Sequence, residues 1–253
     1  MSESELACIK TELARILPLR ALFLQEANRQ VRYDAVHERG WSDSWLLRAD
    51  GVEVGYGAVM GQERADRDTI FEFYVNPPFR RLASRLAAEL LQASGARLVE
   101  CQSNDTLCSA MLFECTRNIH ATTVLFGAGS TTTLTVPGAV FRPKRGDDRM
   151  FEHTAGPEGD FVVEFEGAVV ATGGFLTHYN SPFADIYMEV APTHRRRGIG
   201  AFLVQGVITQ CYLAGRLPAA RCSLDNVASR ATLNRAGLKE SGFMLIGEVA
   251  PPR

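Results

Sequence analysis

The sequence predicts a mixed α/β fold built from two copies of one unit, because the chain contains an internal repeat. Residues 45–59 and 161–175 both read as a short strand, a tight turn at Gly51 or Gly167, and a longer strand. This order is typical of a β-hairpin. In both halves a third strand follows, stops before a proline and leads into a helical stretch. Strands and helices are therefore mixed in each copy.

The elements after each hairpin also correspond in order. The third strands end at Val75 and Val190, and Pro77 and Pro192 follow them at the same spacing. Next come, in the two halves respectively, helices over 82–93 and 198–213 and strands over 96–101 and 220–224. Another helix and a closing strand pair end each copy. Residues 11–29 predict a helix that opens the first copy, and 33–44 predict a polar loop or crossing segment.

A cluster of proline, glycine and charged residues over 140–149 is typical of a linker. We therefore predict two domains, 1–145 and 146–253, each of ordinary single-domain size.

Composition limits the classes of partner. The 253 residues carry a net charge of −2 with a pI near 6.2, which disfavours nucleic-acid binding. Charges interrupt the first twenty residues, and no uncharged apolar run reaches membrane-spanning length. We expect a cytoplasmic protein that is not associated with membranes. The six cysteines form no C-x-x-C pair, so buried thiols are expected rather than disulfides or a metal site.

One strand-to-helix turn has the composition of an anion site. After Val190 come Pro192, three consecutive arginines at 195–197, then Gly198 and Gly200. The first amides of a helix and its positive dipole end favour an anion, and glycines let the backbone approach it. Guanidinium groups match phosphate geometry.

Two other readings of this turn stay open. The arginines can form a solvated patch beside glycines that only tighten the turn. A dinucleotide loop is the other competitor, but Leu203 occupies the position of its third glycine, and no P-loop Gly-Lys-Ser/Thr is present.

Two segments resemble the GCN5-related N-acetyltransferase (GNAT) superfamily. The run Arg195-x-x-Gly198-x-Gly200 is similar to its acetyl-CoA signature, and 226–238 resembles its second motif. The resemblance covers about 161–249 and implies two tandem GNAT-like domains, each a mixed sheet flanked by helices. The first copy resembles the family only in topology. There Ala83 and Arg85 replace the two glycines, which implies a degenerate copy without standard acetyl-CoA binding.

The resemblance implies roles for individual residues. The Val190 backbone would pair with the pantetheine arm, and Asn226 and Ser229 would lie near its thiol end, although Asn226 is also a good helix N-cap. The implied diphosphate-binding residues are Arg195, Arg196, Arg197, Gly198, Ile199, Gly200 and Ala201.

The sequence indicates the general base and the proton donor less clearly than the cofactor-binding residues. Glu189 is the first candidate base and Asp185 the second, and strand alternation puts both on one face with Tyr187. An ordinary polar strand face explains them equally well. Leu233 stands where the family usually has a tyrosine proton donor, so Tyr187, Tyr179 or a water held by Ser229 would replace it. His178 lies in a loop expected to overhang the acceptor site.

The predicted function is direct transfer of an acetyl group from acetyl-CoA, a co-substrate, to an amine on a small molecule or peptide, with no metal. A non-catalytic acyl-CoA-binding or sensor protein is the alternative, and a nucleotide-binding module is a weaker one. A homodimer is compatible with the sequence, which does not identify the acceptor.

Overall fold

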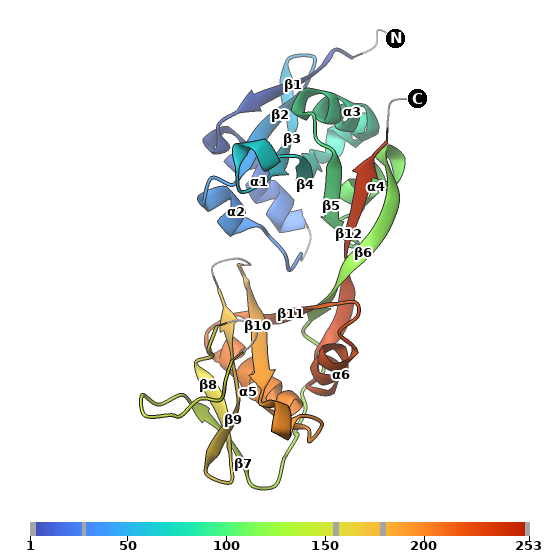
Figure 1. Ribbon diagram of the computed structural model, residues 1–253. Coiled ribbons are helices and arrows are strands. Elements are labelled where there is room, and N and C mark those ends of the chain that lie inside the picture. The colour runs from blue at the N-terminus through green and yellow to red at the C-terminus, as the bar shows by residue number, and fades with distance from the viewer. Residues whose placement is uncertain (1–3, 27–28, 154–156, 178–180, 251–253) are drawn as a thin grey trace. The chain divides into compact units, whose positions relative to one another are not determined.

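The computed structural model describes residues 4–26, 29–153, 157–177 and 181–250 (Figure 1). The chain forms two compact units. Unit 1 comprises Met1–Thr122 with Gly242–Arg253, and unit 2 comprises Thr123–Ser241. Both contain a mixed sheet with helices packed on it, as the sequence predicts.

The sheet of unit 1 combines strands from both ends of the chain. Its strands lie in the order β1 (Leu6–Thr11), β2 (Ser42–Ala49), β3 (Val52–Met60), β4 (Thr69–Val75), β5 (Leu98–Gln102) and β12 (Lys239–Val249). Among the described strands of this unit, only β4 and β5 pair in parallel. The first strand, β1, lies in a segment for which the sequence predicted no strand.

Helices cover both faces of this sheet. They are α1 (Leu13–Glu26), α2 (Asp34–Glu38), α3 (Ala83–Ser94) and α4 (Thr106–Cys115). Leu86 and Leu90 of α3 pack with Met111 of α4 and the strands in one apolar cluster. A second cluster joins Ile16 and Phe23 of α1 to the sheet. Burial on both faces explains why every residue of β4 is buried.

Unit 2 repeats the central part of this arrangement. Its strands lie in the order β6 (Thr116–Gly127), β11 (Leu217–Ser223), β10 (Phe183–Val190), β9 (Ala168–Leu176), β8 (Phe161–Phe165) and β7 (Ala139–Pro143). The parallel pair is β10 with β11. Helix α5 (Ile199–Leu213) packs on β9 and β10, and α6 (Val227–Arg235) packs on α5. No helix in the described ranges is long and apolar enough to cross a membrane.

The two copies exchange their closing strands. By sequence order β6 ends the first copy, but its residues Thr123–Phe126 pair with β11 of the second copy. Strand β12 ends the second copy, yet Met244–Glu248 pair with β5 of the first.

The compact units therefore do not coincide with the predicted domains 1–145 and 146–253. The loop signal at 140–149 falls on β7 and the turn after it, inside unit 2. Local composition marks turns, whereas strand exchange depends on pairing between distant segments.

A buried charged cluster ties α1 and α2 to the sheet of unit 1. The carboxylate of Glu72 accepts hydrogen bonds from Arg20 (Nε to Oε2, 3.0 Å) and Tyr56 (Oη to Oε2, 2.9 Å), and His37 Nε2 lies 3.0 Å from Oε2. Burial favours a higher pKa, but the charge of Arg20 and the contact with His37 outweigh it, so the pKa of Glu72 falls to about 2.

We expect Glu72→Gln to destabilise unit 1 by about 3 kcal/mol at pH 7, because Arg20 loses a buried counter-charge. The folded-state pKa lies below the ordinary value of 4.5, so the carboxylate stabilises the fold above about pH 4.5. This stabilisation disappears as the pH falls toward 2. Urea unfolding between pH 7 and 3 should therefore show a flatter pH dependence in the variant. The control is Glu53→Gln in the surface pair with Arg15, expected to cost under about 1 kcal/mol. An unchanged pH dependence would contradict the assignment.

Candidate functional site

The two parallel strands of unit 2 stop pairing partway along their length. Strand β10 pairs with β11 from Phe183 opposite Leu217 to Ile186 opposite Ala220, and both strands continue beyond the last pair. Unit 1 behaves likewise, since β4 pairs with β5 only at Thr69 and Ile70. The second half of β10, Tyr187–Val190, is thus beyond the parallel ladder. An extended ligand with amide groups can pair with such a strand.

The arginine–glycine turn links β10 to α5. A short 3₁₀ turn, Pro192–His194, follows the strand, and α5 begins at Ile199. Gly198 caps the helix with φ 81°, and Arg196 also has a positive φ of 66°. These left-handed residues turn the chain sharply. The amides of the first helical turn have no intrahelical acceptor, which suits them to an anion.

Four guanidinium groups belong to this region. The side chains of Arg195, Arg196 and Arg197 are exposed. Arg235, at the end of α6, was not predicted. Its guanidinium atoms lie 3.6–3.8 Å from where a Cβ on Gly198 would be. It therefore adds a cation from a different helix to the same turn.

Arg195 also supports the turn itself. Its Nε donates to the Val190 carbonyl at 3.1 Å, and Arg80 makes the same contact with Val75 in unit 1 at 3.2 Å. The carbonyl of Val190 is thus engaged by protein.

Gly200 differs from the expectation that it clears space for an anion. A Cβ there would lie 3.2 Å from both Met188 Cε and Thr232 Cγ2. The missing side chain therefore faces protein, and this glycine allows α5 to approach β10 and α6 closely. Any contribution of Gly200 to an anion site comes from its main-chain amide.

The second predicted segment, 226–238, spans α6. Asn226 Oδ1 accepts a hydrogen bond from the Ser229 amide at 3.0 Å, so Asn226 is the helix N-cap. Ser229 lies beside Cys222, and its hydrogen bond partly offsets the burial that raises the pKa of that thiol. Leu233, at the position of the family tyrosine, is buried and has no proton to donate.

Asp185, Tyr187 and Glu189 alternate along β10, while Met188 and Val190 point to Gly200 of α5. The three side chains therefore share the opposite face of the strand. Their environments differ. Asp185 is buried and ion-paired with Arg221 of β11, whose Nε lies 3.1 Å from Oδ2. Burial, with the charge of Asp160 adding to it, raises the pKa of the Tyr187 hydroxyl.

Glu189 is buried and pairs with a residue that the sequence analysis missed. His153 Nδ1 lies 2.9 Å from Glu189 Oε2, and the His153 ring stacks on Phe151 with centroids 5.4 Å apart. His153 lies in an irregular segment before β8, where no periodicity indicates what it faces. The predicted loop residues His178 and Tyr179 lie outside the described residues.

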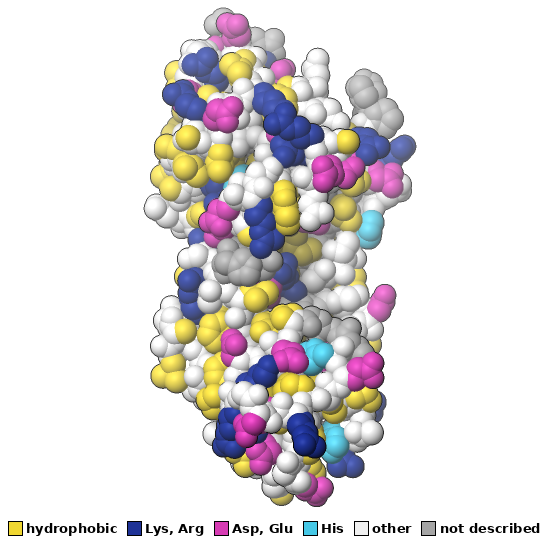
Figure 2. All heavy atoms as spheres, turned by 60° about the vertical axis from the view of Figure 1, so that its left-hand side comes forward, with side chains coloured by type: hydrophobic (Ala, Val, Ile, Leu, Met, Phe, Trp, Pro, Cys, Tyr) yellow, Lys and Arg dark blue, Asp and Glu magenta, His cyan; other side chains and the backbone are white. Residues whose placement is uncertain are grey.

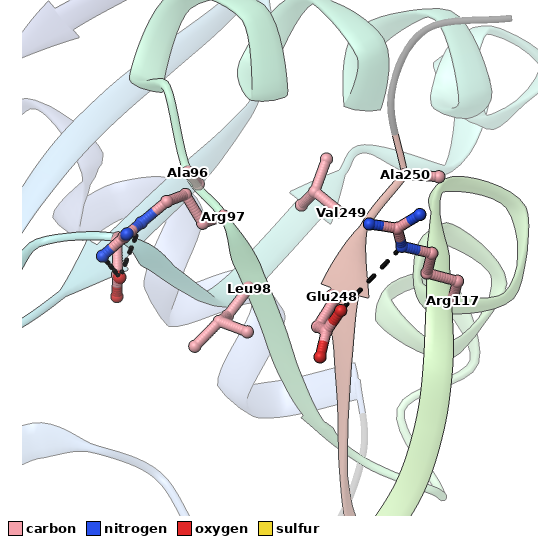
Figure 3. A pocket seen from close by; sticks show the side chains of 8 residues that line it. Ala96, Arg97, Leu98, Arg117, Glu248, Val249 and Ala250 are labelled. Carbon is pink, nitrogen blue, oxygen red and sulfur yellow. Dashed lines mark hydrogen bonds and ion pairs between the residues drawn. The ribbon is translucent and has the colours of Figure 1, made fainter.

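A separate hollow is lined only by residues of unit 1 (Figure 3). Its charged side chains are paired: Arg97 Nε with Asp68 at 3.1 Å, and Arg117 Nε with Glu248 at 3.9 Å. It offers no concentration of cations comparable to the turn in unit 2. Within the described ranges, no group of three His, Cys, Asp or Glu residues could hold a metal ion. On the face in Figure 2, acidic and basic side chains are interspersed.

Comparison with known families finds a match that covers these elements. Residues 132–238, which contain β10, the arginine–glycine turn and α6, match the model of the Acetyltransferase (GNAT) family. The chain carries a GNAT domain. The resemblance inferred from the sequence is thereby confirmed, and the match to this family supports acyl transfer from coenzyme A in general.

Solved structures agree with the GNAT fold over nearly the whole chain. A GNAT-family acetyltransferase from Colwellia psychrerythraea is 14% identical, with a TM-score of 0.74 over 97% of this chain and 100% of that one. A tandem GNAT protein from the clavulanic acid biosynthesis pathway is 13% identical, with a TM-score of 0.58 over 98% and 100%. A GCN5-related N-acetyltransferase from Sphaerobacter thermophilus is 14% identical, with a TM-score of 0.57 over 98% and 97%. Such identities show the fold alone, and they confirm the predicted tandem GNAT-like architecture. Among curated proteins, none matches the chain.

Proposed function

We propose that this protein is an acetyl-CoA-dependent N-acetyltransferase that transfers the acetyl group directly to an amine, with unit 2 as the working copy. The turn before α5 carries the proposal. Two left-handed residues, Arg196 and Gly198, precede the unpaired amides of a helix start, and Arg235 approaches from α6. Amides and cations gathered around one turn suit a diphosphate.

The residues present fit the coenzyme in two places. The amides from Arg196 to Ala201 would hold the diphosphate, with Arg195, Arg197 and Arg235 as neighbouring cations. The second half of β10 would pair with the pantetheine amides, since its parallel ladder ends at Ile186. Ser229 is proposed beside the thiol end. Asn226, as the N-cap, would help to hold that end of α6 in position.

When bound, acetyl-CoA supplies a thioester carbonyl to the site. An amine acceptor must lose a proton before it can attack this carbon, and the departing sulfur must gain one. We assign the first task to the buried Glu189 together with His153, whose Nδ1 lies 2.9 Å from Glu189 Oε2. We assign the second to Tyr187, whose hydroxyl carries a proton at neutral pH and which shares a strand face with Glu189.

Asp185, the second candidate base, is better placed for another role. Its pairing with Arg221 occupies Oδ2. We propose that Asp185 fixes Arg221 on the face that Tyr187 and Glu189 share. The acceptor would be an amine on a small molecule or peptide.

Unit 1 is proposed not to bind the coenzyme in this way. Its 3₁₀ turn, Pro77–Leu82, continues directly into α3, and Leu82 and Ala83 are right-handed, with φ −96° and −56°. Arg85 stands in place of the second glycine, and its Nη2 donates to the Ser4 carbonyl at 3.3 Å. The left-handed turn of unit 2 is therefore not repeated there.

The proposal is tested by measuring binding and turnover separately on the full chain. We expect calorimetry to show one acetyl-CoA site per chain, and release of free thiol with at least one member of a panel of amines, amino acids, aminoglycosides and peptides. Saturable binding without turnover on any acceptor would favour the acyl-CoA sensor instead. Displacement of the ligand by ATP or NAD would favour the nucleotide-binding module.

A further inference from the structure

His153 is a titratable side chain in contact with Glu189, and no family motif includes it. Its ring stacks on Phe151 at an interplanar angle of 19°, and 14% of its side chain is exposed. Glu189 is 6% exposed and is fixed on β10, opposite Thr172 of β9. The Thr172 hydroxyl accepts a hydrogen bond from the Gly159 amide at 2.8 Å. This bond holds the chain just before β8, C-terminal to His153, against β9. The imidazole is thus confined beside the carboxylate.

The two ring nitrogens are in different positions. Nδ1 lies 2.9 Å from Glu189 Oε2. Nε2 is also buried, and among the described residues neither nitrogen has a hydrogen-bond partner of good geometry. Buried polar atoms normally find a partner, so this ring is suited to a ligand or water. Hydrogen bonds of catalytic groups often align only when the substrate is bound.

The carboxylate determines which nitrogen can accept a proton. An ionised carboxylate only accepts hydrogen bonds, so a neutral ring that turns its Nδ1, 2.9 Å away, into line with Glu189 Oε2 carries its hydrogen on Nδ1. Nε2 then has a free lone pair. A carboxylate that orients an imidazole in this way leaves the far nitrogen as a base.

We propose that His153 Nε2 is the atom that takes the proton from the acceptor amine, and that Glu189 is the positioning residue that holds the Nδ1–H tautomer. This inference rests on the proposed acetyltransferase function. One proton passes from the acceptor ammonium to Nε2, which leaves a neutral amine and an imidazolium beside Glu189. The amine nitrogen then bonds to the thioester carbon, and the carbon–sulfur bond breaks with its electron pair on sulfur. The second nitrogen proton passes to sulfur, and the imidazolium returns its proton to solvent.

Two substitutions separate a base from a residue that only positions Glu189. In His153→Asn the amide retains a donor near the position of Nδ1 but provides nothing at Nε2, whereas His153→Ala removes both. A base at Nε2 predicts that both variants lose about 100-fold or more in kcat, with unchanged acetyl-CoA affinity by calorimetry. Near-wild-type kcat in His153→Asn, with a loss only in His153→Ala, would overturn the assignment of the base.

A second readout does not require turnover. In nitrogen-15 spectra recorded where the ring is neutral, we expect wild-type His153 as the Nδ1–H tautomer and a return to the ordinary Nε2–H form in Glu189→Gln. The Nε2–H form in the wild type would overturn the inference by itself. Failure of the proposed function is a different result: acetyl-CoA would not bind, or no amine would be acetylated by the wild type.

Discussion

Gly198→Asp is expected to weaken coenzyme A binding by about 100-fold or more, which corresponds to roughly 2.7 kcal/mol or more. The substitution places a carboxylate at the helix cap, where the Cβ lies 3.6 Å from Arg235 Nη2. The new charge would neutralise that guanidinium and repel the diphosphate. Calorimetric titration with coenzyme A measures the loss directly.

The matched control is Gly198→Asn, because Asn and Asp have the same size and both tolerate the left-handed backbone that Gly198 adopts at φ 81°. The two variants thus share the backbone strain and differ in charge. We expect Asn to reduce affinity by much less than Asp. Ala83→Asp, at the corresponding position of unit 1, should leave binding unchanged. Equal affinities for the Asp and Asn variants of Gly198 would place the diphosphate elsewhere.

Gly200→Asp is a poorer test, although the sequence motif suggests it. The new side chain would collide with Met188 and Thr232 rather than enter an anion site, since a Cβ there already lies 3.2 Å from both. Lost binding in that variant would therefore combine disturbed packing with changed charge.

Glu189→Gln is expected to lower kcat by about 100-fold to 10,000-fold while acetyl-CoA affinity stays within about threefold. The amide keeps the volume of the side chain but removes the negative charge beside His153 Nδ1. Proton removal from the acceptor fails in the variant, whether Glu189 takes the proton itself or orients the imidazole. Single-turnover release of free thiol isolates this step from product release.

The control for this variant is Glu164→Gln on β8, a carboxylate of the same sheet that pairs with Arg142. We expect its kcat to remain within about threefold of the wild type. If Glu189→Gln matches this control, proton transfer does not pass through Glu189.

The sequence predicted those parts of the site whose signals are adjacent along the chain. Three arginines and two glycines after a proline-terminated strand form a contiguous pattern, and strand alternation put Tyr187 and Glu189 on one face. Arg235 and His153 reach the same region from α6 and from an irregular segment before β8. The positions of these two side chains depend on tertiary packing between distant segments, and no periodic pattern in the sequence indicates such packing.

The same distinction applies to the fold. The hairpins and both parallel pairs follow the internal repeat, so the mixed α/β architecture could be predicted. The segment Leu6–Thr11 shows little alternation in burial, and it forms β1 because it pairs with β2 along its whole length. The boundaries of the two compact units likewise depend on pairing between distant strands, β6 with β11 and β12 with β5.

Because β6 and β12 are exchanged, each copy needs a strand from the other to complete its sheet. Severing the chain near residue 145 would leave β5 without β12 within the leading fragment, and β11 without β6 within the trailing one. Both fragments would expose an unsatisfied sheet edge prone to aggregation. Unit 1, whose turn lacks the left-handed residues of unit 2, is therefore still expected to be required, because the first copy donates a strand to the second.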